Sequence, residues 1–151
     1  MVCLPLILSC NNNSNQPESK DGTEKTTSTA SNSNGGKKGH WEGSFTNGMK
    51  ETYISFDVSE DGKELQNLTF RGYWRCDGKL DQTTLGPEKS FIINGNKVDG
   101  TITEPENGGA TAIRYEIHGM FNGDSAEGSF RMNINALACD TYVLNWKAER
   151  K

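Results

Sequence analysis

The stretch IRYEIHGMFN-GD-SAEGSFRMNI, residues 113–134, decides the fold. In each half, apolar or small residues alternate with polar ones, which is the period of a β-strand with one buried face. Gly123 and Asp124 separate the halves, and a Gly-Asp pair between two alternating runs favours a tight turn. The stretch therefore predicts two antiparallel strands joined as a hairpin.

The same alternation recurs outward from this hairpin in both directions. The further runs are 41–45, 54–58, 68–76, 91–93, 98–102 and 142–148. Turn sequences such as Asp77-Gly78 and Asn94-Gly95-Asn96 stand between them, and helical spacing does not recur. We predict an all-β domain, an antiparallel meander of about eight strands folded as a β-sandwich or a flattened barrel.

Composition divides the 151 residues into three segments. Residues 1–9 are almost wholly apolar, Ala30 is the only aliphatic side chain in 11–39, and every aromatic residue lies within 40–151. We predict a signal segment at 1–9, a tether at 10–39 and the β domain at 40–151. Because no apolar run approaches the ~20 residues of a membrane-spanning helix, the sequence predicts none.

The tether consists mainly of Asn, Ser, Thr, Lys and Gly, which bury too little apolar surface to fold. As a flexible coil it has a root-mean-square reach of roughly 30 Å. From residue 40 onward the chain carries 12 Lys and Arg against 17 Asp and Glu, a net charge of −5. We expect no nucleic-acid partner for an acidic domain without a basic cluster.

The amino-terminal apolar stretch closes with Ile7-Leu8-Ser9-Cys10. An apolar stretch closed by a small residue is typical of a secretory signal, and these four residues resemble the bacterial lipoprotein box. The resemblance implies cleavage before Cys10 and acylation of its thiol, with chains such as palmitate anchoring the protein in a membrane. It implies a lipid-anchored protein of the bacterial cell envelope, facing the periplasm or the cell exterior.

The start of the segment departs from this pattern. Signals of this kind begin with Lys or Arg, whereas the first such residue is Lys20, so we expect the signal to begin upstream of Met1. The alternative interpretation is a hydrophobic terminus in which Cys10 occurs by chance.

The four cysteines sort by position. Cys3 lies in the signal segment and Cys10 is the lipidation candidate, which leaves Cys76 and Cys139 in the domain. Two cysteines of an exported domain are expected to form a disulfide. The alternative, a redox-active pair, lacks the Cys-X-X-Cys spacing that lowers a thiol pKa.

The end of the domain contains Gly119-x-Phe121, Ala126-x-Gly128, Cys139-x-Thr141 and Trp146-x-Ala148. It resembles a family of small secreted bacterial all-β domains with the pattern Gly-x-Phe, Ala-x-Gly-Thr, Cys-x-Thr-Gly and Trp-x-Ala. The family has no established activity, so the resemblance implies the fold and the export but no catalytic residues.

Other positions bear on the same resemblance. Cys76 in a middle strand and Ile54-Ser55-Phe56 match the family, whereas Ser129 and Tyr142 stand where it has Thr and Gly. A second, shorter likeness is to lipocalin-type barrels, which begin with Gly-x-Trp and pack a late Arg on that Trp. Here Gly39-His40-Trp41 and Arg150 match, which keeps a ligand-holding barrel as an alternative.

We predict no catalytic residues, no metal site and no cofactor. His40 and His118 are the only histidines, too few for a histidine-rich zinc site. Alternation places His118 on a strand face with charged neighbours, which is typical of a salt-bridged surface. Ser125 follows Gly-Asp in a predicted hairpin, whereas a hydrolase nucleophile needs a strand-to-helix turn and a histidine base.

The candidate ligand surface is Arg71, Tyr73 and Arg75, which alternation places on the face opposite Phe70 and Trp74. Arginines beside an exposed aromatic on a rigid strand can bind sugars, anions or an acidic peptide. The alternative is that a loop covers Tyr73 and that both arginines pair with neighbouring acids. Tyr53 joins this surface if its strand neighbours that one.

The sequence thus favours a membrane-anchored bacterial lipoprotein with a non-catalytic binding or structural domain. Its expected partners are the membrane, through acyl chains on Cys10, and an envelope glycan or protein. The alternative is a small lipocalin-like barrel that carries an apolar ligand, and an envelope hydrolase is third.

Overall fold

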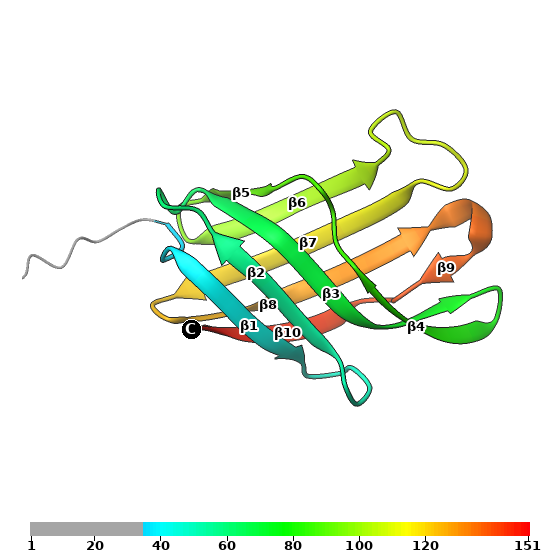
Figure 1. Ribbon diagram of the computed structural model, residues 1–151, viewed down its shortest axis with the longest axis horizontal. Helices are drawn as coiled ribbons and strands as arrows, with labels where there is room; N and C mark the ends of the chain where they lie inside the picture. The colour runs from blue at the N-terminus through cyan, green and yellow to red at the C-terminus, as the bar shows by residue number, and fades with distance from the viewer. Residues whose placement is uncertain (1–34) are drawn as a thin grey trace, which may run out of the picture. The chain divides into compact units, whose positions relative to one another are not determined.

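The computed structural model describes residues 35–151, and this part of the chain is all-β, as predicted (Figure 1). Signal segment 1–9, Cys10 and most of the tether lie outside the described residues. Within them, no helix has the length and apolar character needed to cross a membrane. The elements are β1 Gly39–Phe45, β2 Tyr53–Val58, β3 Glu64–Cys76, β4 Lys79–Leu85, β5 Phe91–Asn94, β6 Lys97–Glu104, β7 Ile113–Asn122, β8 Ser125–Ile134, the one-turn 3₁₀ helix η1 Asn135–Leu137, β9 Cys139–Asp140 and β10 Leu144–Arg150.

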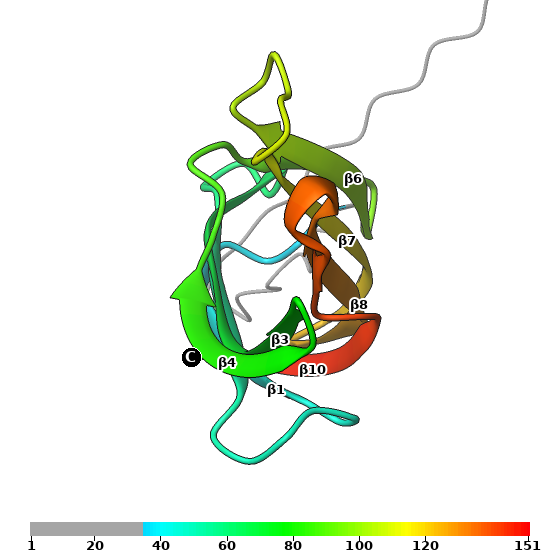
Figure 2. The ribbon, with the colours of Figure 1, turned by 90° about the vertical axis from the view of Figure 1, so that its right-hand side faces the viewer.

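The strands form a flattened ring. Neighbours pair antiparallel in the order β10–β1–β2–β3–β5–β6–β7–β8, and β8 pairs again with β10. Figure 1 shows β1, β2 and β3 crossing in front of β6, β7 and β8, so the ring has two facing layers like a sandwich. β4 pairs only with β3, and the short β9 joins β8 to β3 at the end of the ring that Figure 2 faces.

Aromatic side chains fill the ring. Trp41 stacks on Phe56 with ring centroids 6.0 Å apart, and Phe70 stacks on Phe130 at 5.1 Å. Trp146 meets Phe56 edge-on at 5.8 Å. These five side chains are almost wholly buried, so the space enclosed by the strands is occupied by the protein's own core.

Glycines make room for Trp146 at one side of the ring. Gly128 lies opposite Gly119 on β7 and opposite Trp146 on β10. A Cβ on Gly119 would lie 2.6 Å from Cζ2 of Trp146, and one on Gly128 would overlap the carbonyl oxygen of His118. Gly119, Gly128 and Trp146, which belong to the Gly-x-Phe, Ala-x-Gly and Trp-x-Ala sequences, therefore contribute to core packing.

A disulfide joins Cys76, at the end of β3, to Cys139, at the start of β9, as the sequence predicts. Next to it, Arg75 pairs in register with Asp140, and Asp140 pairs with Asn133 of β8. The covalent bond thus fixes a strand of only two residues between β3 and β8.

The residues before β1 also contact the core. Gly36 is buried, and a Cβ on it would lie 3.2 to 3.4 Å from side-chain atoms of Val58, Ile93 and Phe121. The indole N–H of Trp41 donates to the carbonyl oxygen of Lys37 at 3.0 Å. The described domain therefore begins before the first strand, at residues that we assigned to the tether.

Candidate functional site

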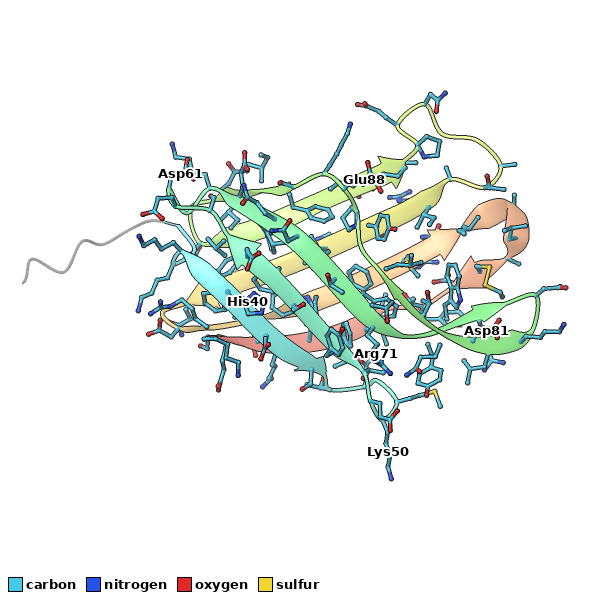
Figure 3. The ribbon with its side chains drawn as sticks, in the orientation of Figure 1. His40, Lys50, Asp61, Arg71, Asp81 and Glu88 are labelled. Carbon is cyan, nitrogen blue, oxygen red and sulfur yellow. A yellow bond between two sulfur atoms is a disulfide. The ribbon has the colours of Figure 1, made fainter. Side chains whose placement is uncertain are left out.

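Arg71, Tyr73 and Arg75 share the face of β3 opposite Phe70, as alternation predicts, with Arg75 exposed and Arg71 and Tyr73 half-buried. β2 and β4 flank this part of β3: Tyr53 lies opposite Arg71 on one side, and β4 pairs along Arg71 to Arg75 on the other. In Figure 3 Arg71 is labelled above the loop that carries Lys50 and to the left of the hairpin that carries Asp81. Because β2 and β3 are neighbours, Tyr53 joins this surface.

A cleft of about 170 Å³ opens beside Tyr73 and Arg75, at the far end of β1 from Gly39. We call it the Tyr73 cleft. The β1–β2 loop, β3, β4 and the segment from β9 to β10 meet there. Its lining residues are Asn47, Gly48, Met49, Thr52, Tyr73, Arg75, Leu80, Asp140, Thr141, Tyr142 and Leu144.

Asn47 holds two walls of the cleft together. Its amide nitrogen donates to the carbonyl oxygen of Val143 at 3.0 Å, and its amide oxygen accepts from the backbone N–H of Asn145 at 2.7 Å. The hydroxyl of Thr52 donates to the carbonyl oxygen of Met49 at 2.7 Å, within the loop. These polar groups are already bonded within the protein.

Asp140 is likewise occupied. Its carboxylate accepts from Nε of Arg131 at 3.1 Å, from a terminal nitrogen of Arg131 at 2.5 Å and from the backbone N–H of Tyr142 at 2.7 Å. Burial raises the pKa of Asp140, but these hydrogen bonds and the Arg131 charge outweigh it, so the pKa lies below its ordinary value. The carboxylate therefore stays charged and paired.

Tyr142 takes up a left-handed backbone conformation, with φ of 56°. We predicted it as the first residue of a strand, but β10 begins only at Leu144. The turn follows from Thr141, whose side chain is buried and accepts from the N–H of Met132 at 2.9 Å. As a result the Tyr142 side chain is 61% exposed at the edge of the cleft.

Three of the four tyrosines lie on this face, namely Tyr53, Tyr73 and Tyr142. The fourth, Tyr115, is in the core, where burial and the nearby Glu104 charge raise its pKa to about 12. Together with Arg71 and Arg75, the three tyrosines form what we call the Tyr–Arg face. Tyrosine and arginine are enriched in binding interfaces.

Exposed apolar side chains border the Tyr–Arg face. Met49, Leu80 and Val143 are each about half exposed and lie in or beside the walls of the cleft. Apolar groups gathered on a surface among polar ones are typical of an interaction site.

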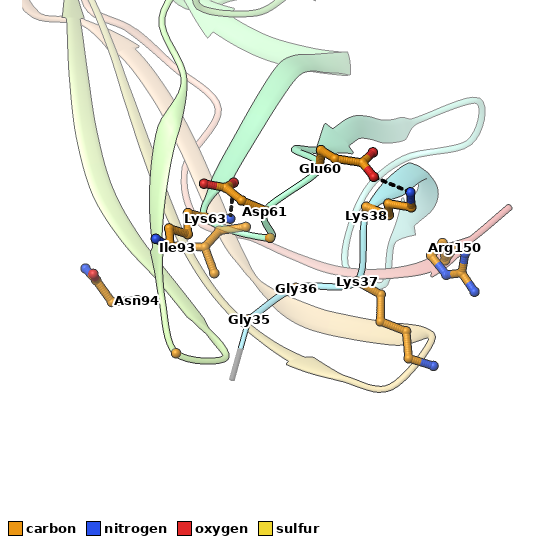
Figure 4. A pocket seen from close by; sticks show the side chains of 12 residues that line it. Gly35, Gly36, Lys37, Lys38, Glu60, Asp61, Lys63, Ile93, Asn94 and Arg150 are labelled. Carbon is orange, nitrogen blue, oxygen red and sulfur yellow. Dashed lines mark hydrogen bonds and ion pairs between the residues drawn. The ribbon is translucent and has the colours of Figure 1, made fainter. Parts of the chain in front are cut away.

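A second hollow, of about 660 Å³, lies where the described chain begins (Figure 4). Its charged side chains are largely paired with one another or with neighbours. Lys38 bonds Glu60, while Lys37 and Arg150 both bond Asp124, at 2.9 Å and 2.7 Å. The hydrogen bond from Lys37, followed by that from Arg150, lowers the pKa of Asp124. These charged groups are therefore already paired within the protein, whereas Arg75 in the Tyr73 cleft has no ion pair among the described residues.

Arg150 is also the late arginine of the short likeness to lipocalin-type barrels. It lies opposite Trp41 in the β1–β10 register, and its side chain covers Gly39, 3.7 Å from the position that a Cβ would take. Arg150 thus lies beside Gly39 and pairs in register with Trp41 at this end of the ring. Behind Trp41, however, lie core side chains.

Asp99, His118 and Ser129 face one another across β6, β7 and β8. His118 Nδ1 lies 3.0 Å from Asp99 Oδ1, so His118 sits on an ion-paired surface, as expected. Within the described residues Ser129 has no hydrogen bond to His118, the contact that activates a serine nucleophile. No cluster of three potential metal ligands occurs in this part of the chain.

His40 forms a network across β1, β2 and β3. Its Nδ1 lies 2.7 Å from Asp57 Oδ1, and Asp57 Oδ2 accepts from the Asn67 amide at 2.8 Å. The hydrogen bond to Asp57 raises the pKa of His40, and the bonds from Asn67 and then His40 lower that of Asp57. This exposed network links the first three strands of the domain.

Alternation identified the residues of β3 but not the other walls of the Tyr73 cleft. Two tertiary features bring the other residues to the cleft. Tyr142 reaches it because β9 crosses from β8 to β3, and Asn47 and Thr52 reach it because the β1–β2 loop folds against the segment from β9 to β10.

Searches of family models, of curated proteins and of solved structures find no match to the chain.

Proposed function

We propose that this protein is a bacterial envelope lipoprotein, anchored by acyl chains on Cys10, whose β domain binds an extended envelope polymer without catalysis. The lipoprotein-type sequence Ile7 to Cys10 and the polar segment after it support the anchor. The Tyr–Arg face supports the binding role, and it is the single observation on which that role rests.

The filled interior favours a surface binder over a carrier. A carrier of an apolar ligand needs an internal cavity, whereas Trp41, Phe56 and Trp146 occupy the ring. At about 170 Å³, the Tyr73 cleft is smaller than the roughly 300–1,000 Å³ of sites for whole small molecules. It fits one unit of a longer chain, and the exposed tyrosines beside it offer contacts for further units.

The position of the cleft suits a tethered module. The described chain enters β1 at Gly39, and the cleft lies beyond Phe45, at the other end of this strand. A domain held to a membrane through the polar segment before β1 can therefore present the Tyr–Arg face away from the membrane.

The anchor is tested by Cys10→Ser. Expressed in a bacterium from a gene that supplies the upstream part of the signal, the parent chain is expected in the membrane fraction and the variant in the aqueous fraction, because each lost acyl methylene removes ~0.8 kcal/mol of membrane affinity. Cys3→Ser is the matched control and should remain with the membrane. Equal partitioning of parent and Cys10→Ser would refute acylation at this residue.

Binding is tested with the full chain carrying Cys3→Ser and Cys10→Ser, which we call the acylation-free chain. It is titrated with envelope glycans, peptidoglycan fragments, fatty acids and phospholipids, and binding is read as a rise in melting temperature. We expect glycans to bind. The double variant Tyr73→Ala/Tyr142→Ala should weaken binding at least tenfold, because it removes both aromatic side chains that line the cleft with Arg75.

Met120→Ala is the matched control, since Met120 is exposed on β7 and does not line the Tyr73 cleft. It should bind as the parent does. Binding of lipids alone, unaffected by the tyrosine changes, would instead favour the carrier.

A further inference from the structure

Arginines of the described domain fall into two groups. Arg114 pairs with Glu116 at 2.7 Å, Arg131 with Asp140 and Arg150 with Asp124. The other two, Arg71 and Arg75, form no ion pair with any described residue, although both lie in a regular strand. An unpaired guanidinium keeps five N–H donors in a planar fork for a ligand.

The neighbours of Arg75 explain why it is unpaired. Asp140 lies opposite Arg75 in register, but Arg131 and the N–H of Tyr142 already bond its carboxylate. Asp81 pairs in register with Trp74, so alternation places it on the other face of the β3–β4 hairpin from Arg75. The guanidinium of Arg75 is therefore unpaired within the described chain and exposed to solvent, in the cleft that Tyr73 and Leu80 also line.

Both arginines are held on a rigid base. Arg71 lies between Tyr53 of β2 and Thr84 of β4, and Arg75 lies between Asp140 of β9 and Leu80 of β4. Along the extended strand their Cα atoms are four residue steps apart, which is about 13 Å, and Tyr73 lies midway. This spacing suits two anionic groups on one extended ligand, with an apolar surface between them.

We propose that the polymer bound by the Tyr–Arg face is an acidic glycan, with carboxylate groups held by Arg71 and Arg75 and sugar rings packed on the tyrosines. The inference rests on the proposed binding function and adds the chemistry of the ligand. Tyrosine presents an apolar ring and a polar hydroxyl, which suits the mixed surface of a sugar. A guanidinium binds a carboxylate through two parallel hydrogen bonds.

The same face is poorly suited to an acidic peptide. Extended peptides gain affinity by pairing their backbone with a free sheet edge. β3, the strand that carries both arginines, is not such an edge: Arg71 is paired with β2 and β4, and Arg75 with β9 and β4. A glycan needs side-chain donors and flat apolar surfaces instead, and this face supplies both.

The test uses the acylation-free chain and three probes: polygalacturonate, its carboxyl-reduced neutral product and poly-glutamate. Calorimetry should show polygalacturonate binding at least tenfold more tightly than either other probe, and more weakly as salt is added. Arg71→Gln and Arg75→Gln should each reduce its affinity at least fivefold. Arg114→Gln is the matched control and should leave it unchanged.

Chain length gives a second measurement. Tetragalacturonate should bind the parent well above fourfold more tightly than galacturonate, because one molecule can reach both arginines. In Arg71→Gln this advantage should be several-fold smaller than in the parent, because only one arginine remains.

The outcomes separate this inference from the proposed function. Equal affinity for the acidic and the neutral polymer, or insensitivity to both arginine changes, overturns the acidic ligand but leaves a glycan-binding module. Tighter binding of poly-glutamate overturns the glycan in favour of a peptide. If neither glycan binds, the inference fails. The proposed binding function also fails only if none of the envelope glycans, peptidoglycan fragments, fatty acids and phospholipids of the first test binds.

Discussion

Replacing Cys76 and Cys139 by alanine in the acylation-free chain is expected to lower the free energy of unfolding by about 4 kcal/mol. The bond links residues 63 positions apart, and its loss frees a long loop in the unfolded chain. In the native state β9 has a single register pair with β3, so the disulfide is its main link to that strand. Urea unfolding followed by tryptophan fluorescence measures the change.

The same change should also weaken ligand binding, because β9 carries Asp140 and positions Tyr142. Leu137→Ala is the control, since this side chain is about half exposed near Cys139; it should cost less than about 0.5 kcal/mol. A loss below about 1 kcal/mol in the double cysteine variant would mean that the disulfide contributes little to the fold.

Gly128→Ala is expected to destabilise the domain by about 3 kcal/mol or more, an unusually large effect for one added methyl group. The new Cβ would overlap the carbonyl oxygen of His118 and lie 2.6 Å from the Cα of Gly119. Both obstacles are backbone atoms of β7, so β7 and β8 must separate where Trp146 packs. The midpoint of urea unfolding should therefore fall sharply.

Ser129→Ala supplies the comparison for Gly128→Ala. Ser129 is the next residue of β8 and lies across from His118. Its replacement by alanine removes the hydroxyl and adds no atom, so we expect the free energy of unfolding to change by less than about 0.5 kcal/mol. If both variants unfold at the same urea concentration, the strands do not approach closely at Gly128.

Alternation located the eight strands of the ring because each has one face in a continuous core. Its failures have a structural cause. The sequence KLDQTTL of β4 shows no alternation, since this strand continues beyond the ring and exposes most of its residues; its pairing with β3 defines it. At Asn67, with φ of 51°, the β2–β3 register shifts, so Leu65 and Leu68 are both buried although alternation would separate them.

The candidate site, like the fold, is only partly predictable from the sequence. Arg71, Tyr73 and Arg75 share a face by the local geometry of one strand, so the sequence alone placed them together. The lack of an ion partner for Arg75 could not be predicted, because it depends on Arg131 of β8 reaching Asp140 of β9. The exposure of Tyr142 depends likewise on the buried contact that Thr141 makes with Met132.

The central position of β1 has a mechanical consequence. This strand is paired along its length with β2 on one side and β10 on the other, the chain enters it at Gly39, and the Tyr73 cleft lies past its far end. A load applied between the entering chain and a ligand in the cleft acts along β1 and shears the hydrogen bonds of both ladders at once. A strand at the edge of an open sheet would instead peel away bond by bond, so we expect the closed ring to resist pulling in the direction in which the proposed tethered binder would be pulled.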